Sequence, residues 1–135
     1  MCCHVLLFPV QTAKAFLPWM LENDYGYIVN IVSILSQLPL AGATSYCASK
    51  SSAWMLCESL KYELRAMGKN GITVSCVCPY LIRTGMFHGL DPPFKWLLPT
   101  LTPEYVAERT LQAITDRQFL VLTPRLLYFL LVLAR

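Results

Sequence analysis

Two short apolar runs limit what this chain can fold into. Tyr27–Val32 (YIVNIV) and Ile72–Val77 (ITVSCV) are rich in β-branched and aromatic residues and are nearly continuous. Runs of this kind are typical of strands buried on both faces, as in a parallel sheet. Parallel strands need a long crossover between them, and the intervening segment has helical spacing from Ser45 to about Met67. We therefore expect a strand-helix-strand unit at the centre of the chain.

Helical and strand-like patterns also alternate in the rest of the chain. The further elements expected are a helix over about Val10–Glu22, a helix from Pro103 to about Thr115, a third strand over Gln118–Leu122 and an apolar segment over Leu126–Ala134. Pro18 is predicted to kink the first helix or to end it early. This order predicts an α/β fold with a parallel sheet, in which ligands bind beyond the carboxyl ends of the strands.

Size and composition exclude several classes of protein. The chain has 135 residues, which is enough for one domain. Only 14% of them are charged, compared with about 25% in ordinary proteins. The net charge is +3, but no basic run is interleaved with aromatic residues, so nucleic-acid binding is not expected.

The two ends of the chain and its cysteines leave some alternatives open. The first residues lack the basic start of a signal peptide, and no run of 18 apolar residues predicts a transmembrane helix. Leu126–Ala134 could be a core helix, an interfacial anchor, or the start of a longer segment. Cys76 and Cys78 should share one face of a strand. They could belong to a metal or redox site, but small buried hydrophobic residues are the favoured reading.

A tyrosine and a lysine four residues apart stand at the start of the central helix. This spacing places Tyr46 and Lys50 on one helical face. A lysine ammonium next to a phenol stabilises the phenolate, so such a pair can transfer protons near neutral pH. By itself the pair also fits an ordinary amphipathic surface. The context favours the chemical reading, because Ser33 directly follows a predicted strand, thirteen residues before Tyr46.

With Cys78-Pro79 closing the next strand and Thr84 five residues after Pro79, the sequence resembles the short-chain dehydrogenase/reductase family. That family carries a serine at the end of a strand, a Y-x-x-x-K helix and a proline-led cofactor loop in this order. The segments that carry the resemblance are AFLPWM, YIVNIVS, YCASK, CPYLIRTGMF and TPRLLYF. They look closest to the retinol dehydrogenase and 17-beta-hydroxysteroid dehydrogenase branch, and within it to the epidermal-type all-trans-retinol dehydrogenases.

The resemblance implies roles for six residues. Tyr46 would be the catalytic acid and base, and Lys50 would lower the pKa of a catalytic phenol and bind the nicotinamide ribose. Ser33 would orient the substrate oxygen. Thr84 would contact the nicotinamide carboxamide, with Pro79 and Ile82 lining the same pocket. From the residues alone, Ser33 could also simply cap a loop, and Thr84 could be an ordinary turn hydroxyl.

The sequence also departs from the family pattern. No glycine-rich turn for a cofactor pyrophosphate is present, and neither is the N-A-G motif. The family's catalytic asparagine would fall in the first ten residues, where none stands, and Tyr80 replaces the usual glycine after Pro79. We therefore expect residues 1–135 to be a single incomplete domain, the C-terminal half. Its fold would be a partial Rossmann-like, doubly wound parallel sheet lacking the N-terminal dinucleotide-binding strands, with an unpaired apolar edge.

The functional expectation is an NAD- or NADP-dependent oxidoreductase that oxidises retinol or a related lipid or steroid alcohol. The alternative is a catalytically silent fragment that binds a full-length relative. The resemblance implies a homo- or heterodimer through the helices at Val10–Glu22 and Ser45–Met67. It also implies that the apolar segment 119–135 associates with a membrane. The location would be the cytosolic face of the endoplasmic reticulum membrane or a lipid droplet.

Overall fold

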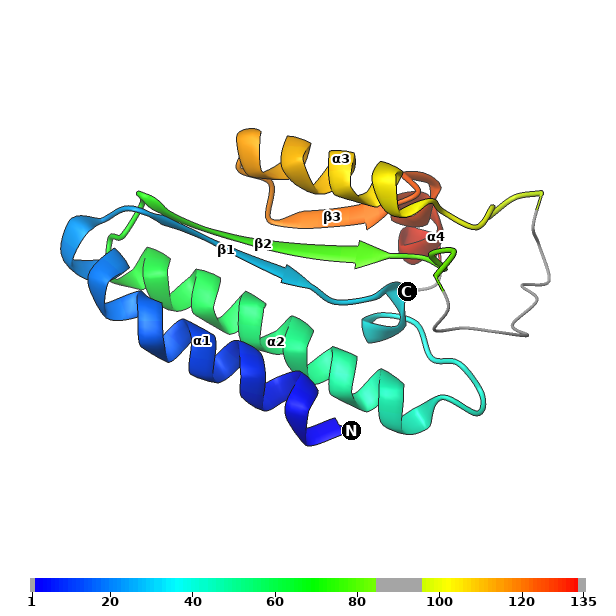
Figure 1. Cartoon of the computed structure of the whole chain (residues 1–135), viewed down its shortest axis with the longest axis horizontal. Coiled ribbons are helices and arrows are strands. Elements are labelled where there is room, and N and C mark those ends of the chain that lie inside the picture. Colours follow the sequence, from blue (N-terminus) through cyan, green and yellow to red (C-terminus); the bar gives the residue numbers. More distant parts are fainter. Residues whose placement is uncertain (1, 85–95, 134–135) are drawn as a thin grey trace.

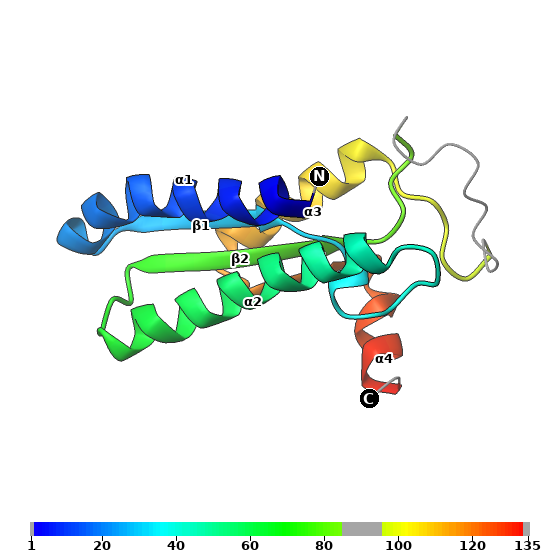
Figure 2. The same cartoon turned by 90° about the horizontal axis from the view of Figure 1, so that it is seen from below.

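The computed structural model describes residues 2–84 and 96–133, which form a three-stranded parallel sheet with helices on both faces. The strands, in spatial order, are β1 (Gly26–Ile31), β2 (Ile72–Pro79) and β3 (Leu120–Thr123). The other elements are α1 (Cys2–Asn23), the 3-10 turn η1 (Ile34–Ser36), α2 (Thr44–Ala66), α3 (Pro103–Thr115) and α4 (Leu126–Leu133). Helices α1 and α2 lie side by side on one face of the sheet, and α3 covers the other (Figure 1, Figure 2).

The predicted strand-helix-strand unit is confirmed as β1-α2-β2. The two strands are parallel, with Gly26 opposite Ile72 and Ile31 opposite Val77. Helix α2 crosses between them and packs on the sheet with a row of buried residues at helical spacing: Ser49, Ala53, Cys57, Leu60 and Leu64. The observed boundaries differ from the predicted ones by one or two residues for β1, α2 and the start of β3.

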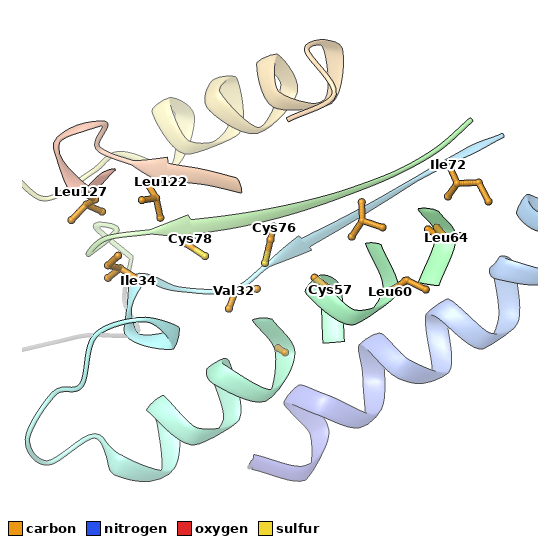
Figure 3. Packing of buried hydrophobic residues seen from close by; sticks show 12 residues of the cluster. Val32, Ile34, Cys57, Leu60, Leu64, Ile72, Cys76, Cys78, Leu122 and Leu127 are labelled. Atoms are coloured by element: carbon orange, nitrogen blue, oxygen red, sulfur yellow. The ribbon is translucent and has the colours of Figure 1, made fainter. Parts of the chain in front are cut away.

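The core has two parts, one on each face of the sheet. The larger part lies between the sheet and α2, and Figure 3 shows how residues of α2, β2 and the segment after β1 point toward one another there. The smaller part joins Ala113 of α3 to Val77 and Val121. Because β2 contributes to both parts, it is buried along nearly its whole length, as its apolar sequence predicts.

Helix α1 differs from the expectation. It contains Pro9 and Pro18 and nevertheless runs from Cys2 to Asn23, so the early end predicted at Pro18 is wrong. A proline inside a helix removes one backbone hydrogen bond. The apolar face of the last turns, which includes Leu17 and Met20, packs against the core on either side of Pro18 and offsets that loss.

The two outer edges of the sheet differ in whether their backbone groups have hydrogen-bond partners. On the outer side of β3, the Tyr128 hydroxyl donates a hydrogen bond to the Leu120 carbonyl (2.7 Å) and accepts one from the Leu122 N–H (3.0 Å). This side chain therefore occupies groups that a further strand would use. β1 pairs only with β2, and within residues 2–84 and 96–133 no strand lies on its other side. The predicted unpaired edge is thus the outer edge of β1.

The C-terminal segment forms helix α4, of which Leu127 is buried against the larger core. Phe129, Val132 and Leu133 on the same helix are exposed. In the part of the chain that the structure describes, no helix is both long and apolar enough to cross a membrane.

Shortening a residue of the larger core should destabilise the fold. Leu64 is 2% exposed, and a Leu→Ala change at such a site costs about 2–5 kcal/mol. We expect Leu64→Ala to lower the free energy of unfolding, measured by urea denaturation, by an amount in this range. Leu111→Ala, at a position that is 65% exposed, is the matched control and should change it by less than about 0.5 kcal/mol. Equal losses in both variants would contradict this packing.

Candidate active site

Ser33 lies where the chain leaves β1. It is 8% exposed and caps η1, because its Oγ accepts a hydrogen bond from the Leu35 N–H (3.2 Å). Its carbonyl accepts bonds from the N–H and the hydroxyl of Ser36 at 3.0 and 2.7 Å. The capping reading of Ser33 is therefore confirmed. The Oγ can still donate its own proton, since a hydroxyl donates as well as accepts.

Lys50 reaches the same end of β1 from the second turn of α2. Its Nζ donates a hydrogen bond to the Ile31 carbonyl at 3.4 Å. It also lies 5.8 Å from the centre of the Tyr46 ring. The expectation that Tyr46 and Lys50 share one helical face is thus confirmed. The contact with Ile31, two residues before Ser33, brings the lysine to the strand that presents the serine.

Burial changes the acidity of this lysine. Its removal from water lowers the pKa of Lys50 below 10.5, and the smaller effects of the thiols of Cys78 and Cys76 act in the opposite direction. Burial disfavours a charged group, and ionisable groups whose pKa is shifted in this way occur both at functional sites and in structural networks.

The thiols beneath this edge belong to the core. Cys57, Cys76 and Cys78 are free and buried, and all three lie in the larger core cluster. The interpretation of Cys76 and Cys78 as small buried hydrophobic residues is therefore confirmed. The pKa of Cys78 is lowered, mainly by a hydrogen bond from Cys76, and Ser36 Oγ lies 3.9 Å from the Cys78 sulfur. Among the described residues, no group of three or more His, Cys, Asp or Glu side chains could hold a metal ion.

The segment after β2 carries the remaining predicted residues. Pro79 is the last residue of β2 and is buried. Ile82 forms a single parallel bridge with Leu101, flanked by hydrogen bonds from the Arg83 N–H to the Leu101 carbonyl and from the Leu101 N–H to the Leu81 carbonyl (both 2.8 Å). Thr84 is exposed and donates its N–H to the Ile82 carbonyl (2.8 Å).

The fold gathers the predicted residues at one place. Ser33, Pro79 and the bridge at Ile82 follow the carboxyl ends of β1 and β2, and α2 begins beside η1 at this same edge (Figure 1). Of the segment between Ile82 and Leu101, residues 85–95 lie outside the part of the chain that the structure describes. The roles of the six residues as catalytic and cofactor-binding groups stay predictions.

Two partners in this region were missed by the sequence reasoning. The Ile31 carbonyl that accepts from Lys50 is a backbone group, and every residue carries one, so no residue type signals it. Leu101 pairs with Ile82 across a long sequence separation, and a single bridge has no period to detect. Asn30, a polar residue in the middle of β1, donates a hydrogen bond to the Cys57 sulfur at 3.3 Å.

Three groups of complementary chemistry thus stand at the carboxyl edge. A phenol can take up or release a proton, a nearby ammonium stabilises the phenolate, and a hydroxyl can hydrogen-bond a substrate oxygen. This edge is also where open parallel α/β sheets bind ligands. Fold and site together define a partial Rossmann-like α/β protein with a tyrosine-lysine pair at its ligand edge.

Comparison with known proteins identifies the family. A family model for short chain dehydrogenases matches residues 4–93. Retinol dehydrogenase 10-B of Xenopus laevis is 42% identical over 96% of this chain, and human retinol dehydrogenase 10 is 43% identical over 93%. Short-chain dehydrogenase/reductase family 16C member 6 of Bos taurus is 44% identical over 84%. The chain belongs to the short-chain dehydrogenase family, as the resemblance implied.

Solved structures agree with this assignment. A short-chain dehydrogenase from Sphingobium yanoikuyae in complex with NADPH superposes with a TM-score of 0.75 at 25% identity over 90% of this chain and 46% of that one. One from Burkholderia phymatum in complex with NAD gives 0.72 at 25% identity, over 88% of this chain and 50% of that one. The present chain spans 36–38% of the length of the curated relatives above, which confirms that its fold is a partial one.

The burial of Lys50 predicts a distinctive effect of pH. Its lowered pKa means that the folded state binds fewer protons than the unfolded state between that pKa and 10.5. This group's contribution to stability therefore rises with pH in that window. We expect the free energy of unfolding of wild type, relative to Lys50→Met, to increase as the pH rises toward 10.5. Urea denaturation at a series of pH values measures it, and a wild-type advantage that falls over this rise would contradict the half-buried ammonium.

Proposed function

We propose that this chain carries the catalytic and nicotinamide-side half of an NAD- or NADP-dependent oxidoreductase acting on retinol or a related lipid or steroid alcohol. The observation that supports it most is the contact of Lys50 with the Ile31 carbonyl, which brings the lysine that lies beside Tyr46 to the end of β1, two residues before Ser33. The substrate class is supported by the curated relatives, which are named retinol dehydrogenases.

The proposed chemistry assigns one task to each side chain. Tyr46 removes the proton from the substrate hydroxyl during oxidation and returns it during reduction. Lys50 stabilises the phenolate by its charge. Its ammonium donates one hydrogen bond to the Ile31 carbonyl and is partly removed from water, so a further N–H can be donated to a ribose. Ser33 donates the proton of its Oγ to the substrate oxygen, while the same oxygen stays fixed by the Leu35 N–H.

The residues present fit one end of the cofactor. The ammonium of Lys50 lies at the end of β1, and the segment after β2 carries the exposed Thr84 and the half-buried apolar side chain of Ile82. These residues would hold the nicotinamide and its ribose. When bound, the nicotinamide exchanges a hydride with the carbinol carbon. The six glycines of this chain do not form the glycine-rich turn that holds the pyrophosphate of a dinucleotide. The contacts to the adenine and pyrophosphate end of the cofactor would therefore have to come from outside residues 1–135.

An apolar substrate also fits the C-terminal part of the chain. The segment 119–135 ends in the apolar helix α4, whose exposed side chains Phe129, Val132 and Leu133 suit an interfacial position on a membrane. We place the protein on the cytosolic face of the endoplasmic reticulum membrane or on a lipid droplet, where a retinoid or steroid dissolves.

Removing one hydroxyl tests the catalytic role. We expect Tyr46→Phe to lower oxidation of all-trans-retinol at least about 100-fold, because general acid-base catalysis contributes factors of this size. Membranes from cells expressing the chain, supplied with NAD or NADP, provide the assay, with retinaldehyde as the product measured. Tyr62→Phe, at an exposed position on the same helix, is the control and should keep full activity. Equal rates in wild type and Tyr46→Phe would contradict the assignment.

A second candidate function is supported by the surface of α1. Phe8, Phe16 and Trp19 are 71%, 61% and 58% exposed, an unusual density of aromatic surface on one helix. In this alternative the chain is catalytically silent and binds a full-length relative through α1 and α2, forming a heterodimer. Absence of retinaldehyde from wild type in the assay above would favour this candidate over the enzyme.

Replacing two of these aromatic residues tests the dimer. We expect Phe16→Ser combined with Trp19→Ser to reduce co-purification with full-length retinol dehydrogenase 10 at least about tenfold, since buried aromatic residues dominate interface energies. Leu111→Ser, which changes an exposed apolar residue of α3, is the matched control and should not affect it. Unchanged recovery of the double variant would exclude this face as the interface.

A further inference from the structure

A second hollow lies at the opposite end of the sheet from the candidate active site. Its volume is about 240 Å³, and its walls come from the end of α2, the α2–β2 turn, the start of β2 and the α3–β3 connection. The amino ends of the strands border it, whereas Ser33 and Pro79 follow the carboxyl ends. The two sites are therefore separated by the length of β2.

The walls of this hollow carry four cations, Lys61, Arg65, Lys69 and Arg117. They make up four of the eleven lysines and arginines of a chain whose net charge is +3. The lining residues of the hollow, all within the described part of the chain, include no carboxylate. Among acids near these residues, Asp116 accepts a hydrogen bond from the Gln118 amide at 3.1 Å, and Asp24 accepts one from the Gly71 N–H at 3.1 Å. Glu63, next to Leu64 in the sequence, does not line the hollow.

Aromatic rings hold two of the cations in place. The Nζ of Lys61 lies 3.7 Å from the centre of the Phe119 ring. The guanidinium of Arg117 lies 5.7 Å from the centre of the Tyr27 ring. A ring attracts a cation without accepting its N–H bonds in the way a carboxylate does. These side chains are thus positioned while their hydrogen-bond donors stay available.

The backbone of Arg117 supports the same conclusion. Its φ of 52° lies in the left-handed region, at the position after a helix where glycine is the usual residue. A long cationic side chain at this position costs conformational energy that glycine would avoid. The chain nevertheless carries an arginine here, and that arginine lines the hollow.

A backbone donor faces the same space. The Cys76 N–H bonds to the Phe119 carbonyl on the β3 side (2.6 Å). Alternate residues of a strand direct their N–H groups to the same side, so the Val74 N–H also faces that side. Because β3 begins only opposite Cys76, no described strand covers this part of the edge of β2.

The end of helix α2 explains only part of this cluster. The carboxyl end of a helix carries partial negative charge, which favours cations nearby. That effect accounts for Arg65 in the last turn. The same effect at the end of α3 favours Arg117, which follows the cap residue Asp116. It does not account for Lys61, whose ammonium lies over Phe119, or for the fact that cations from the ends of two separate helices line one hollow. A ligand of opposite charge would suit this convergence.

We propose that this hollow is a binding site for a phosphate-bearing anion, held by Arg65, Lys69 and Arg117 and by the Val74 N–H. Guanidinium groups and backbone N–H groups are the usual donors to phosphate oxygens. The small volume suits one phosphate or pyrophosphate group. That group could belong to a soluble phosphate ester or to the headgroup of an acidic phospholipid.

Titration of the whole chain with pyrophosphate tests the site directly. The ¹⁵N-labelled protein is titrated at low salt without nicotinamide cofactor, and the amide signals of Asn70, Thr73 and Phe119 are followed. We expect saturable shifts centred on these residues. In Arg65→Gln/Arg117→Gln the affinity should fall at least about tenfold, because hydrogen bonds to charged groups are among the strongest in proteins.

A control removes the same charge elsewhere. Lys14→Gln/Arg125→Gln also takes away two exposed cations and should change the affinity less than about twofold. Should the first variant not give a folded spectrum, Arg65→Gln/Lys69→Gln replaces it with the same expectation. Absence of saturation, or equal weakening in the test and control variants, would overturn the proposal.

A vesicle experiment separates the two sources of phosphate. Flotation is compared for vesicles of phosphatidylcholine alone and of phosphatidylcholine with phosphatidic acid. Binding that requires phosphatidic acid and is lost in Arg65→Gln/Arg117→Gln identifies a lipid headgroup. Pyrophosphate binding without such flotation identifies a soluble phosphate ester. Both outcomes support an anion site, and flotation that the substitutions leave unchanged counts against the lipid source.

Discussion

The packing of α2 on β1 and β2 is the constraint on which the rest of the molecule depends. Two parallel strands cannot be connected by a tight turn. The helix between them must lie on the face of the sheet and return the chain to the end at which the first strand began. The buried row from Ser49 to Leu64 fixes the rotation of α2 about its axis. That rotation in turn directs Lys50 to the Ile31 carbonyl, at the point where β1 releases Ser33. The position of α2 therefore determines both the packing of the core and the location of Lys50 in the candidate active site.

This dependence explains which features could be predicted from the sequence. The strand-helix-strand order, the shared face of Tyr46 and Lys50 and the burial of Cys76 and Cys78 follow from local periodicity, and the structure agrees with each. The path of α1 through Pro18 was not predictable, because the outcome is decided by tertiary contacts such as that of Met20 with the core. The acceptor of Lys50 and the bridge between Ile82 and Leu101 were missed for a related reason: they are backbone pairings between distant segments, and side-chain type carries no information about them.

The charges are distributed unevenly along the sheet. At the carboxyl edge the half-buried ammonium of Lys50 lies near thiols and hydroxyls, and its partial burial lowers the pKa of Lys50. At the amino edge four cations line an open hollow, and two of them, Lys61 and Arg117, lie over aromatic rings. The ammonium of Lys50 is partly removed from water, whereas the cations of the hollow border an open space. The two groups of charges lie at opposite ends of β2.

The hydrogen bonds of the Tyr128 hydroxyl have a consequence for self-association. They occupy the Leu120 carbonyl and the Leu122 N–H on the outer edge of β3. Within the described sheet, the outer edge of β1 is the one left open to another strand. Exposed strand edges are templates for pairing with a further strand. The described sheet can therefore be extended on one side, and a tyrosine far from that side blocks the other.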